Sequence, residues 1–97
     1  MKTIWKYAIQ PGENMIFIPE GAEFLNVHTE GRGVVCAWVR VDPGAPLTRR
    51  VVYTFATGHD IEGGWETAPY IGTFFVENLV FHLFDGGEEG VRGGKNA

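Results

Sequence analysis

The chain has 97 residues, of which 44% are hydrophobic and 21% charged, as is usual for one globular domain. No apolar run approaches the roughly 18 residues of a membrane span, and the first residues lack the apolar core of a signal peptide. These features predict a cytoplasmic protein that does not bind membranes. The net charge of −4 argues against general nucleic-acid binding.

The charges are divided unevenly along the chain. Residues 31–58 contain four arginines and one aspartate, whereas residues 59–89 contain seven carboxylates and neither lysine nor arginine. An anionic ligand, subunits that meet basic face to acidic face, or pairing within one subunit would each explain this division. Because three Trp, three Tyr and seven Phe residues are many for one small core, we expect a homo-oligomer with aromatic residues in its subunit contact.

The hydrophobic pattern predicts short strands, with turn signals rich in Gly and Pro between them. In chain order the predicted strands are Lys2–Ile9, Asn14–Ile18, Ala22–Thr29, Val34–Val41, Arg49–Ala56, Tyr70–Val76 and Leu79–Phe84. No stretch has a helical period. The sequence therefore predicts an all-β protein, a single-domain antiparallel β-sandwich or small barrel of about seven short strands.

The pattern also predicts the limits of the domain and its core. We expect a β domain over residues 1–85 and a flexible glycine-rich tail over residues 86–97, because the tail has too little apolar surface to offset the cost of ordering it. Gly72 marks a bulge or a close approach inside its strand. The residues expected to be buried are Val39, Val51, Tyr53, Leu79, Phe81 and Leu83.

Residues that could carry catalysis or hold a metal are few. The histidines His28, His59 and His82 form no H-x-H or H-x-x-x-H pair, and the single Cys36 lies inside a strand. No glycine-rich phosphate-binding motif is present. We predict no enzyme, no metal and no cofactor, and keep a hydrolase that uses the adjacent His59 and Asp60 as an alternative.

Residues suited to binding gather around the strand Arg49–Ala56 and the loop after it. Arginine can donate charge-assisted hydrogen bonds to phosphate, and aromatic rings can stack on a base. The residues predicted to bind a ligand are Arg49, Arg50, Thr57, Gly58, His59, Trp65 and Tyr70. Because side chains alternate along a strand, Arg49 and Arg50 point to opposite faces, and only one can serve a given pocket.

Several motifs carry a family resemblance. They are Lys2-Thr3-Ile4-Trp5-Lys6-Tyr7, Ile18-Pro19-Glu20-Gly21-Ala22, Cys36-Ala37-Trp38, Val41-Asp42-Pro43, Thr57-Gly58-His59, Tyr70-Ile71-Gly72-Thr73 and Val80-Phe81-His82. In this order, over residues 2–84, they resemble an uncharacterised family of small proteins encoded by bacteriophages and prophages. The resemblance implies a phage accessory protein that acts in the cytoplasm of a bacterial host, and it assigns no catalytic or binding residue.

Two functions from different classes follow as hypotheses. The first is a non-enzymatic anti-defence protein that binds and sequesters a small phosphorylated or nucleotide-like signal of the host, by analogy with other small phage proteins. The alternative is a protein that binds another protein, as an inhibitor or adaptor of a host enzyme or as a minor structural protein of the phage. The expected partner is therefore a nucleotide-like ligand or a host protein.

Overall fold

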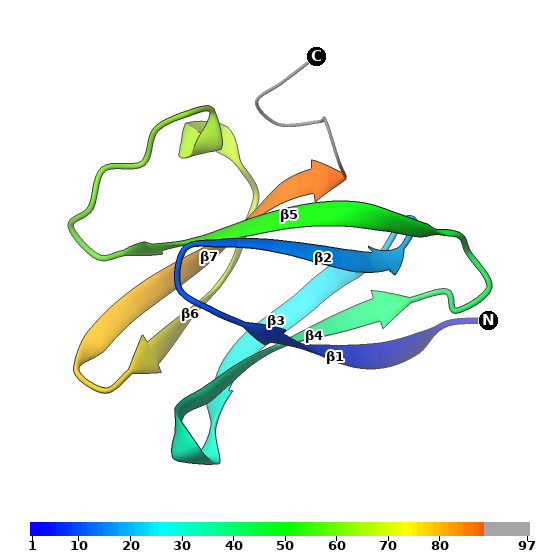
Figure 1. Ribbon diagram of the computed structural model, residues 1–97, viewed down its shortest axis with the longest axis horizontal. Coiled ribbons are helices and arrows are strands. Elements are labelled where there is room, and N and C mark those ends of the chain that lie inside the picture. The colour runs from blue at the N-terminus through cyan, green and yellow to red at the C-terminus, as the bar shows by residue number, and fades with distance from the viewer. Residues whose placement is uncertain (89–97) are drawn as a thin grey trace.

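The computed structural model describes residues 1–88, which form seven strands in two antiparallel sheets (Figure 1). The strands are β1 (Thr3–Ile9), β2 (Glu13–Pro19), β3 (Glu23–Glu30), β4 (Val34–Val41), β5 (Leu47–Ala56), β6 (Tyr70–Val76) and β7 (Leu79–Glu88). Two short 3₁₀ turns, η1 (Gly31–Gly33) and η2 (Trp65–Thr67), lie in the connections. The predicted all-β sandwich and each of its predicted strands are confirmed.

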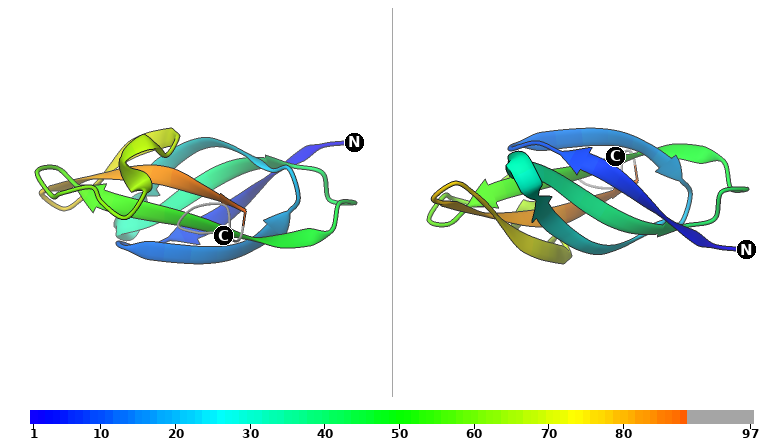
Figure 2. Two further views of the ribbon diagram at one scale, coloured as in Figure 1. Left: turned by 90° about the horizontal axis from the view of Figure 1, so that it is seen from above. Right: turned by 90° about the horizontal axis from the view of Figure 1, so that it is seen from below.

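The chain passes repeatedly from one sheet to the other. β1, β4 and β3 form the three-stranded sheet in that order, and β2, β5, β7 and β6 form the four-stranded sheet. The β1–β2 connection changes sheets at Gly12, and the β2–β3 connection changes sheets at Gly21. Both glycines have positive φ, which a residue with a side chain adopts at a cost. Figure 2 shows the turn η2 against the four-stranded sheet in its left view.

The outer face of the three-stranded sheet carries ion pairs. Lys6 Nζ lies 3.3 Å from Glu30 Oε1, and Arg40 Nε lies 3.0 Å from Glu23 Oε1. The Lys6 ammonium also lies 5.2 Å from the centre of the Trp38 ring. Charged residues that neutralise one another in this way are typical of a sheet face exposed to solvent.

The two sheets meet along β3 and β6. Thr29 Oγ1 of β3 donates to the carbonyl of Phe75 in β6 at 2.6 Å. Beside it the pairing of β6 with β7 shifts register at Gly72, and a Cβ added there would lie 2.8 Å from Val27 Cγ1. The prediction of a bulge or close approach at Gly72 is confirmed on both counts.

The core between the sheets consists mainly of aliphatic side chains. Its buried members are Ile9, Ile18, Ala22, Val27, Val35, Ala37, Val39, Val41, Val52, Phe74 and Leu83. The core prediction is confirmed for Val39 and Leu83 and is wrong for Leu79, which is 58% exposed at the start of β7. Phe81 is half-buried and stacks on Phe74 with their ring centres 5.5 Å apart.

The inward face of β5 is opposite to the predicted one. Val52 and Thr54 are buried, whereas Val51, Tyr53 and Phe55 turn outward and are half-buried. Thr54 satisfies its hydroxyl by accepting a hydrogen bond from the Gly12 N–H at 2.6 Å. The most aromatic face of this strand is therefore outside the core.

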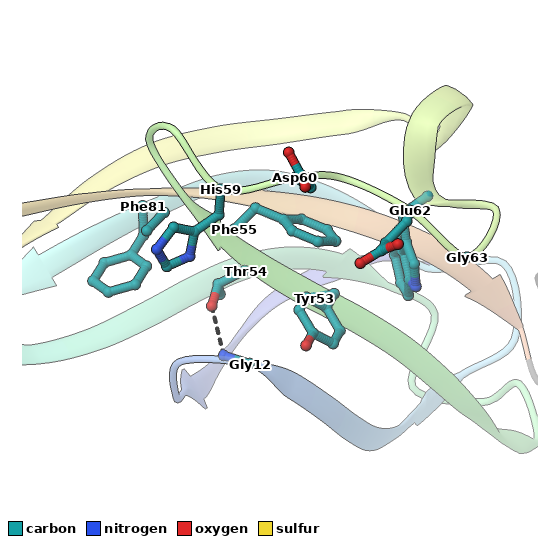
Figure 3. A pocket seen from close by; sticks show the side chains of 11 residues that line it. Gly12, Tyr53, Thr54, Phe55, His59, Asp60, Glu62, Gly63 and Phe81 are labelled. Carbon is teal, nitrogen blue, oxygen red and sulfur yellow. Dashed lines mark hydrogen bonds between the residues drawn. The ribbon is translucent and has the colours of Figure 1, made fainter.

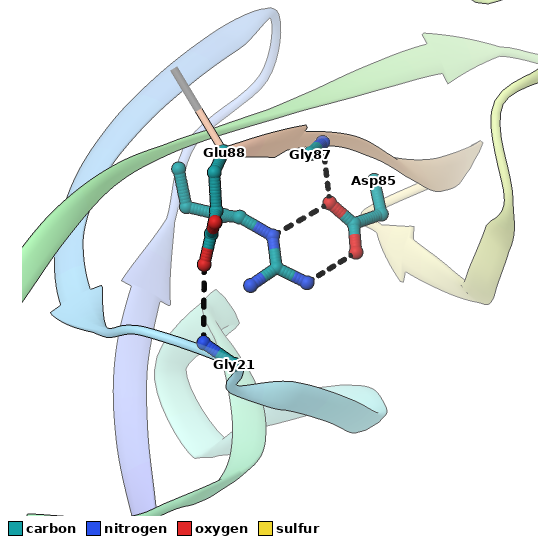
Figure 4. A network of polar contacts seen from close by, with 5 residues as sticks. Gly21, Asp85, Gly87 and Glu88 are labelled. Carbon is teal, nitrogen blue, oxygen red and sulfur yellow. Dashed lines mark hydrogen bonds and ion pairs between the residues drawn. The ribbon is translucent and has the colours of Figure 1, made fainter. Parts of the chain in front are cut away.

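One charged pair lies inside the sandwich. Arg50, only 8% exposed, donates from Nε and Nη2 to the two carboxylate oxygens of Asp85 at 2.9 and 2.7 Å (Figure 4). The Gly87 N–H donates to the same carboxylate at 2.8 Å, and the guanidinium carbon lies 5.3 Å from the centre of the Phe24 ring. This corrects the prediction that Arg50 contacts a ligand, because its guanidinium is held within the fold.

The last described strand runs past the predicted domain boundary at Asp85. Glu88 is paired with Arg50 of β5, and its carboxylate accepts a hydrogen bond from the Gly21 N–H at 3.0 Å (Figure 4). Residues 86–88 thus belong to β7 and not to a tail. The remainder of the predicted tail, residues 89–97, lies outside the described residues.

Candidate functional site

The outer face of the four-stranded sheet is dominated by aromatic and apolar side chains. Antiparallel partners point to the same side of a sheet, so the strand register defines which residues belong to it. We call it the aromatic face; it includes Met15, Phe17, Val51, Tyr53, Phe55, Tyr70, Phe75, Val80, His82 and Phe84, together with the polar residues Glu13, Arg49 and Thr73. Phe17, Tyr70 and Phe75 are 62%, 58% and 59% exposed, so this face presents large apolar side chains to solvent.

The rings near the centre of this face form a connected cluster. Tyr53 and Phe55 are stacked with their centres 4.6 Å apart, and Phe84 meets the edge of Phe55 at 5.9 Å. Tyr70 extends the cluster across β6 at 5.8 Å from Phe84. Aromatic pairs at these separations stabilise one another by more than the free energy of burying their surface, so the rings hold one another in place.

Trp65, from the turn η2, completes the cluster. Its ring lies 5.6 Å from Tyr53 and 6.3 Å from Phe55. It rests on the backbone of β7 at Gly86, where an added Cβ would lie 2.5 Å from Trp65 Cη2 and 2.8 Å from the Val51 carbonyl oxygen. The absence of a side chain at Gly86 therefore lets the indole lie against the strand.

A cleft of about 490 Å³ opens between the ring cluster and the loop that follows β5 (Figure 3). It lies beside the last residues of β5, which extend past the point where β2 begins. Its lining residues are Gly12, Tyr53, Thr54, Phe55, Ala56, His59, Asp60, Glu62, Gly63, Trp65 and Phe81. Its size falls within the range of small-molecule and side-chain binding pockets.

The charged groups of the cleft are acidic. Asp60 and Glu62 line it, both are exposed, and none of the described lining residues is Lys or Arg. Figure 3 shows the Glu62 carboxylate turned toward the rings and the Asp60 carboxylate turned away from them. Such a lining attracts a positively charged group and repels a phosphate.

The predicted ligand residues are only partly brought together. His59 and Trp65 line the cleft, as predicted residues of one pocket should. Arg49 points outward, opposite to Arg50, as alternation requires, and lines a separate hollow with Phe17 and Glu88. Its Nη1 donates to Met15 Sδ at 3.1 Å. The two arginines and the cleft therefore do not form one site.

Thr57 and Tyr70 belong to a hydrogen-bonded chain beside the cleft. Thr57 Oγ1 lies 2.7 Å from His82 Nε2, and Thr73 Oγ1 lies 3.0 Å from His82 Nδ1. The Tyr70 hydroxyl is hydrogen-bonded to Thr73 Oγ1. These hydrogen bonds join the turn after β5 to strands β6 and β7. They leave the Tyr70 ring exposed on the aromatic face.

Gly58 shapes the turn that presents His59. Its φ of 92° allows the His59 N–H to donate to the Ala56 carbonyl at 3.0 Å. Within the described residues no hydrogen bond joins the side chains of His59 and Asp60, so the dyad that a hydrolase would need is not formed. Nor does any group of three or more His, Cys, Asp or Glu side chains in residues 1–88 have an arrangement that could hold a metal ion.

Sequence reasoning missed Tyr53 and Phe55 as site residues. Their alternation was visible, but hydrophobicity alone favours burial for the face that carries them. The opposite charges of Arg50 and Asp85, on two strands that pair, could have indicated that the Arg50 face of β5 turns inward and that Tyr53 and Phe55 turn outward.

Among residues 1–88, no helix is long and apolar enough to cross a membrane. A family model described as "Domain of unknown function (DUF7352)" matches residues 1–93. Comparisons with curated proteins and with solved structures gave no match. Because the family model covers nearly the whole chain, the protein belongs to this family.

Proposed function

We propose that this member of the DUF7352 family is a non-enzymatic binding protein that engages another protein through its aromatic face. In the setting that the phage resemblance implies, the partner is a protein of the bacterial host, and binding inhibits or redirects it. The observation that carries the proposal is the presence of large exposed rings, Phe17, Tyr70 and Phe75, on one sheet face. Large apolar side chains gathered on one exposed face are typical of interaction sites in soluble proteins.

The contrast with the other sheet supports this assignment. The outer face of the three-stranded sheet carries Lys6, Glu30, Arg40 and Glu23 in pairs that suit water. On the aromatic face the exposed side chains Phe17, Tyr70 and Phe75 are rings instead. Aromatic side chains are also the residue type most enriched at the centre of protein interfaces.

The charges around the aromatic face favour a partner with a basic surface. Glu13 lies beside Tyr53 in the sheet, and the loop over the face adds Asp60, Glu62 and Glu66. A host protein with basic residues opposite this loop would complement these carboxylates.

A phosphorylated or nucleotide-like ligand has less support. Such a ligand needs cations beside the aromatic cleft, but Arg50 is held inside the fold by Asp85 and Arg49 lines a different hollow. The cleft instead presents Asp60 and Glu62. The homo-oligomer expected from the sequence stays a prediction, and it would have to use another surface or compete with the partner.

Affinity capture from host cells tests the proposal, with the captured protein then purified and titrated by calorimetry. The double variant Phe17→Ser/Phe75→Ser removes two exposed rings, so we expect folding to be kept and binding to weaken by at least about tenfold, as when interface anchors are truncated. The matched control is Ile4→Ser/Val34→Ser, which removes exposed apolar side chains from the other sheet. Equal weakening by both variants, or no weakening by the first, would reject the aromatic face as the binding surface.

A further inference from the structure

We infer that the cleft beside the aromatic face is a subsite for a guanidinium group, the side chain of one arginine on the partner protein. This inference rests on the proposed function and specifies what the partner must present. The cleft combines a set of mutually packed rings, an acidic lining and enough room for a long side chain. No residue of the described chain fills it with a cation.

The rings supply the surface on which a guanidinium can lie. Tyr53 and Phe55 are nearly parallel, with 29° between their planes, and Trp65 meets them at a tilt. Each ring has a negative face that attracts a cation, and tryptophan attracts it most strongly. The planar guanidinium stacks on such rings and is more weakly hydrated than an ammonium, so the cleft suits arginine better than lysine.

A carboxylate in reach of the rings supplies the charge. Glu62 points toward the ring cluster from the loop above it (Figure 3). A carboxylate can accept two parallel hydrogen bonds from one guanidinium while the guanidinium plane stays against a ring. Asp60 also lines the cleft, and because its carboxylate is turned away from the rings it adds negative potential without covering them (Figure 3).

The loop that carries these groups is held in place without a ligand. Trp65 is seated on Gly86, and Glu66 Oε1 accepts a hydrogen bond from the Gly64 N–H at 3.0 Å. Gly63 and Gly64 have φ of 72° and 90°, which glycine adopts without strain. A site that is already ordered loses little entropy on binding, so a single arginine side chain can be recognised there.

Amide and indole NMR spectra of the whole chain test this with small probes. The probes are N-acetyl-arginine methylamide, the citrulline analogue as its neutral isostere, the lysine analogue and AMP. We expect saturable millimolar binding of the arginine probe, with shifts confined to the residues that line the cleft, including the Trp65 indole. The citrulline probe should bind about threefold to fivefold more weakly, the scale of one exposed ion pair.

Charge variants locate the interaction. Glu62→Gln should weaken the arginine probe by a similar factor, whereas Glu20→Gln, an equal change of charge at an exposed turn, should leave it unchanged. Equal binding of citrulline, lysine or AMP in the cleft would overturn the guanidinium assignment, as would absence of shifts in the cleft.

The two proposals fail separately. If Phe17→Ser/Phe75→Ser abolishes partner binding but the cleft does not bind the arginine probe, the guanidinium subsite is rejected and the aromatic face is kept as the binding surface. If the probe binds as expected but partner affinity is unaffected by the ring variants, the aromatic face is rejected instead.

Discussion

At the scale of single residues, the ion pair of Arg50 and Asp85 determines which face of β5 turns inward. Both side chains are nearly buried, and the bidentate geometry satisfies the guanidinium from two sides. A buried charge without its partner is costly, so any arrangement that turned Tyr53 inward would place Arg50 outward and leave the Asp85 carboxylate alone. The aromatic face follows from this constraint.

Removing one member of this pair should be strongly destabilising. Asp85→Ala leaves Arg50 buried without its carboxylate, so we expect the free energy of unfolding to fall by about 3–5 kcal/mol. Glu23→Ala is the control, because its pair with Arg40 is about half exposed and should contribute no more than about 1 kcal/mol. Urea unfolding of both variants measures the difference, and equal midpoints would show that the buried pair is not a constraint.

Cys36 should be unreactive in the folded protein. Burial raises the pKa of its thiol, and the Glu30 carboxylate 3.7 Å away raises it further, while Lys6 partly opposes this. A thiol with a raised pKa keeps its proton to higher pH, so alkylation should begin at higher pH in the folded than in the unfolded chain.

The rate of alkylation against pH measures this directly. Glu30→Gln removes the carboxylate charge and keeps the burial, so its profile should move to lower pH, part of the way toward that of the unfolded chain. Coincident profiles for the folded and unfolded protein would contradict the prediction.

At the scale of elements, Gly86 and Trp65 join the loop of η2 to the four-stranded sheet. Gly86→Ala would place a Cβ against both the indole and the Val51 carbonyl, which cannot move away easily. We expect a loss of stability of about 1–3 kcal/mol, the usual cost of overpacking, and displacement of the Trp65 ring. Gly31→Ala is the control, because nothing lies within 4 Å of its added Cβ.

Two measurements separate these effects. Thermal unfolding reports stability, and the chemical shift of the Trp65 indole reports the position of its ring. Unchanged indole shifts in Gly86→Ala would show that the loop is not seated on this glycine.

The end of β7 provides a second prediction for an element. Truncation after Asp85 removes the Gly87 and Glu88 hydrogen bonds to Asp85 and Gly21, so the protein should lose stability. Truncation after Glu88 keeps both hydrogen bonds, so it should unfold at a higher midpoint than truncation after Asp85. If the two truncations unfold at the same midpoint, residues 86–88 contribute nothing to the strand.

Periodicity predicted every strand because alternation of apolar residues is a local property of the chain. It could not predict which face of β5 is inside, since Val51, Tyr53 and Phe55 are as apolar as the core. That choice depends on Arg50 meeting Asp85, which are far apart in sequence and are joined only when β5 pairs with β7.

The sequence predicted part of the candidate site, as it predicted the strands but not the inward face of β5. The turn at Gly58 and the neighbouring aromatic loop pointed to His59 and Trp65, and the structure brings both to one cleft. The expected cations are absent from it, because strand alternation sends Arg50 inward and the register places Arg49 next to Phe17. Only the assembled sheet shows that the cleft is acidic.

At the scale of the whole molecule, the two outer faces differ in kind. One carries ion pairs between Lys, Arg and Glu side chains, and the other carries exposed rings beside an acidic loop. The core lies between the inner faces of the two sheets, and we propose that a partner protein covers the apolar outer face.

Native mass spectrometry, followed by denaturing mass spectrometry, of the protein purified from the cells in which it acts shows whether this face binds another protein. We predict a complex of this chain with a second, different protein, which separates on denaturation and is lost in the variant Phe17→Ser/Phe75→Ser. Retention of a small molecule of nucleotide mass on the native protein, released on denaturation and kept by the variant, would contradict the claim and restore the sequestration hypothesis.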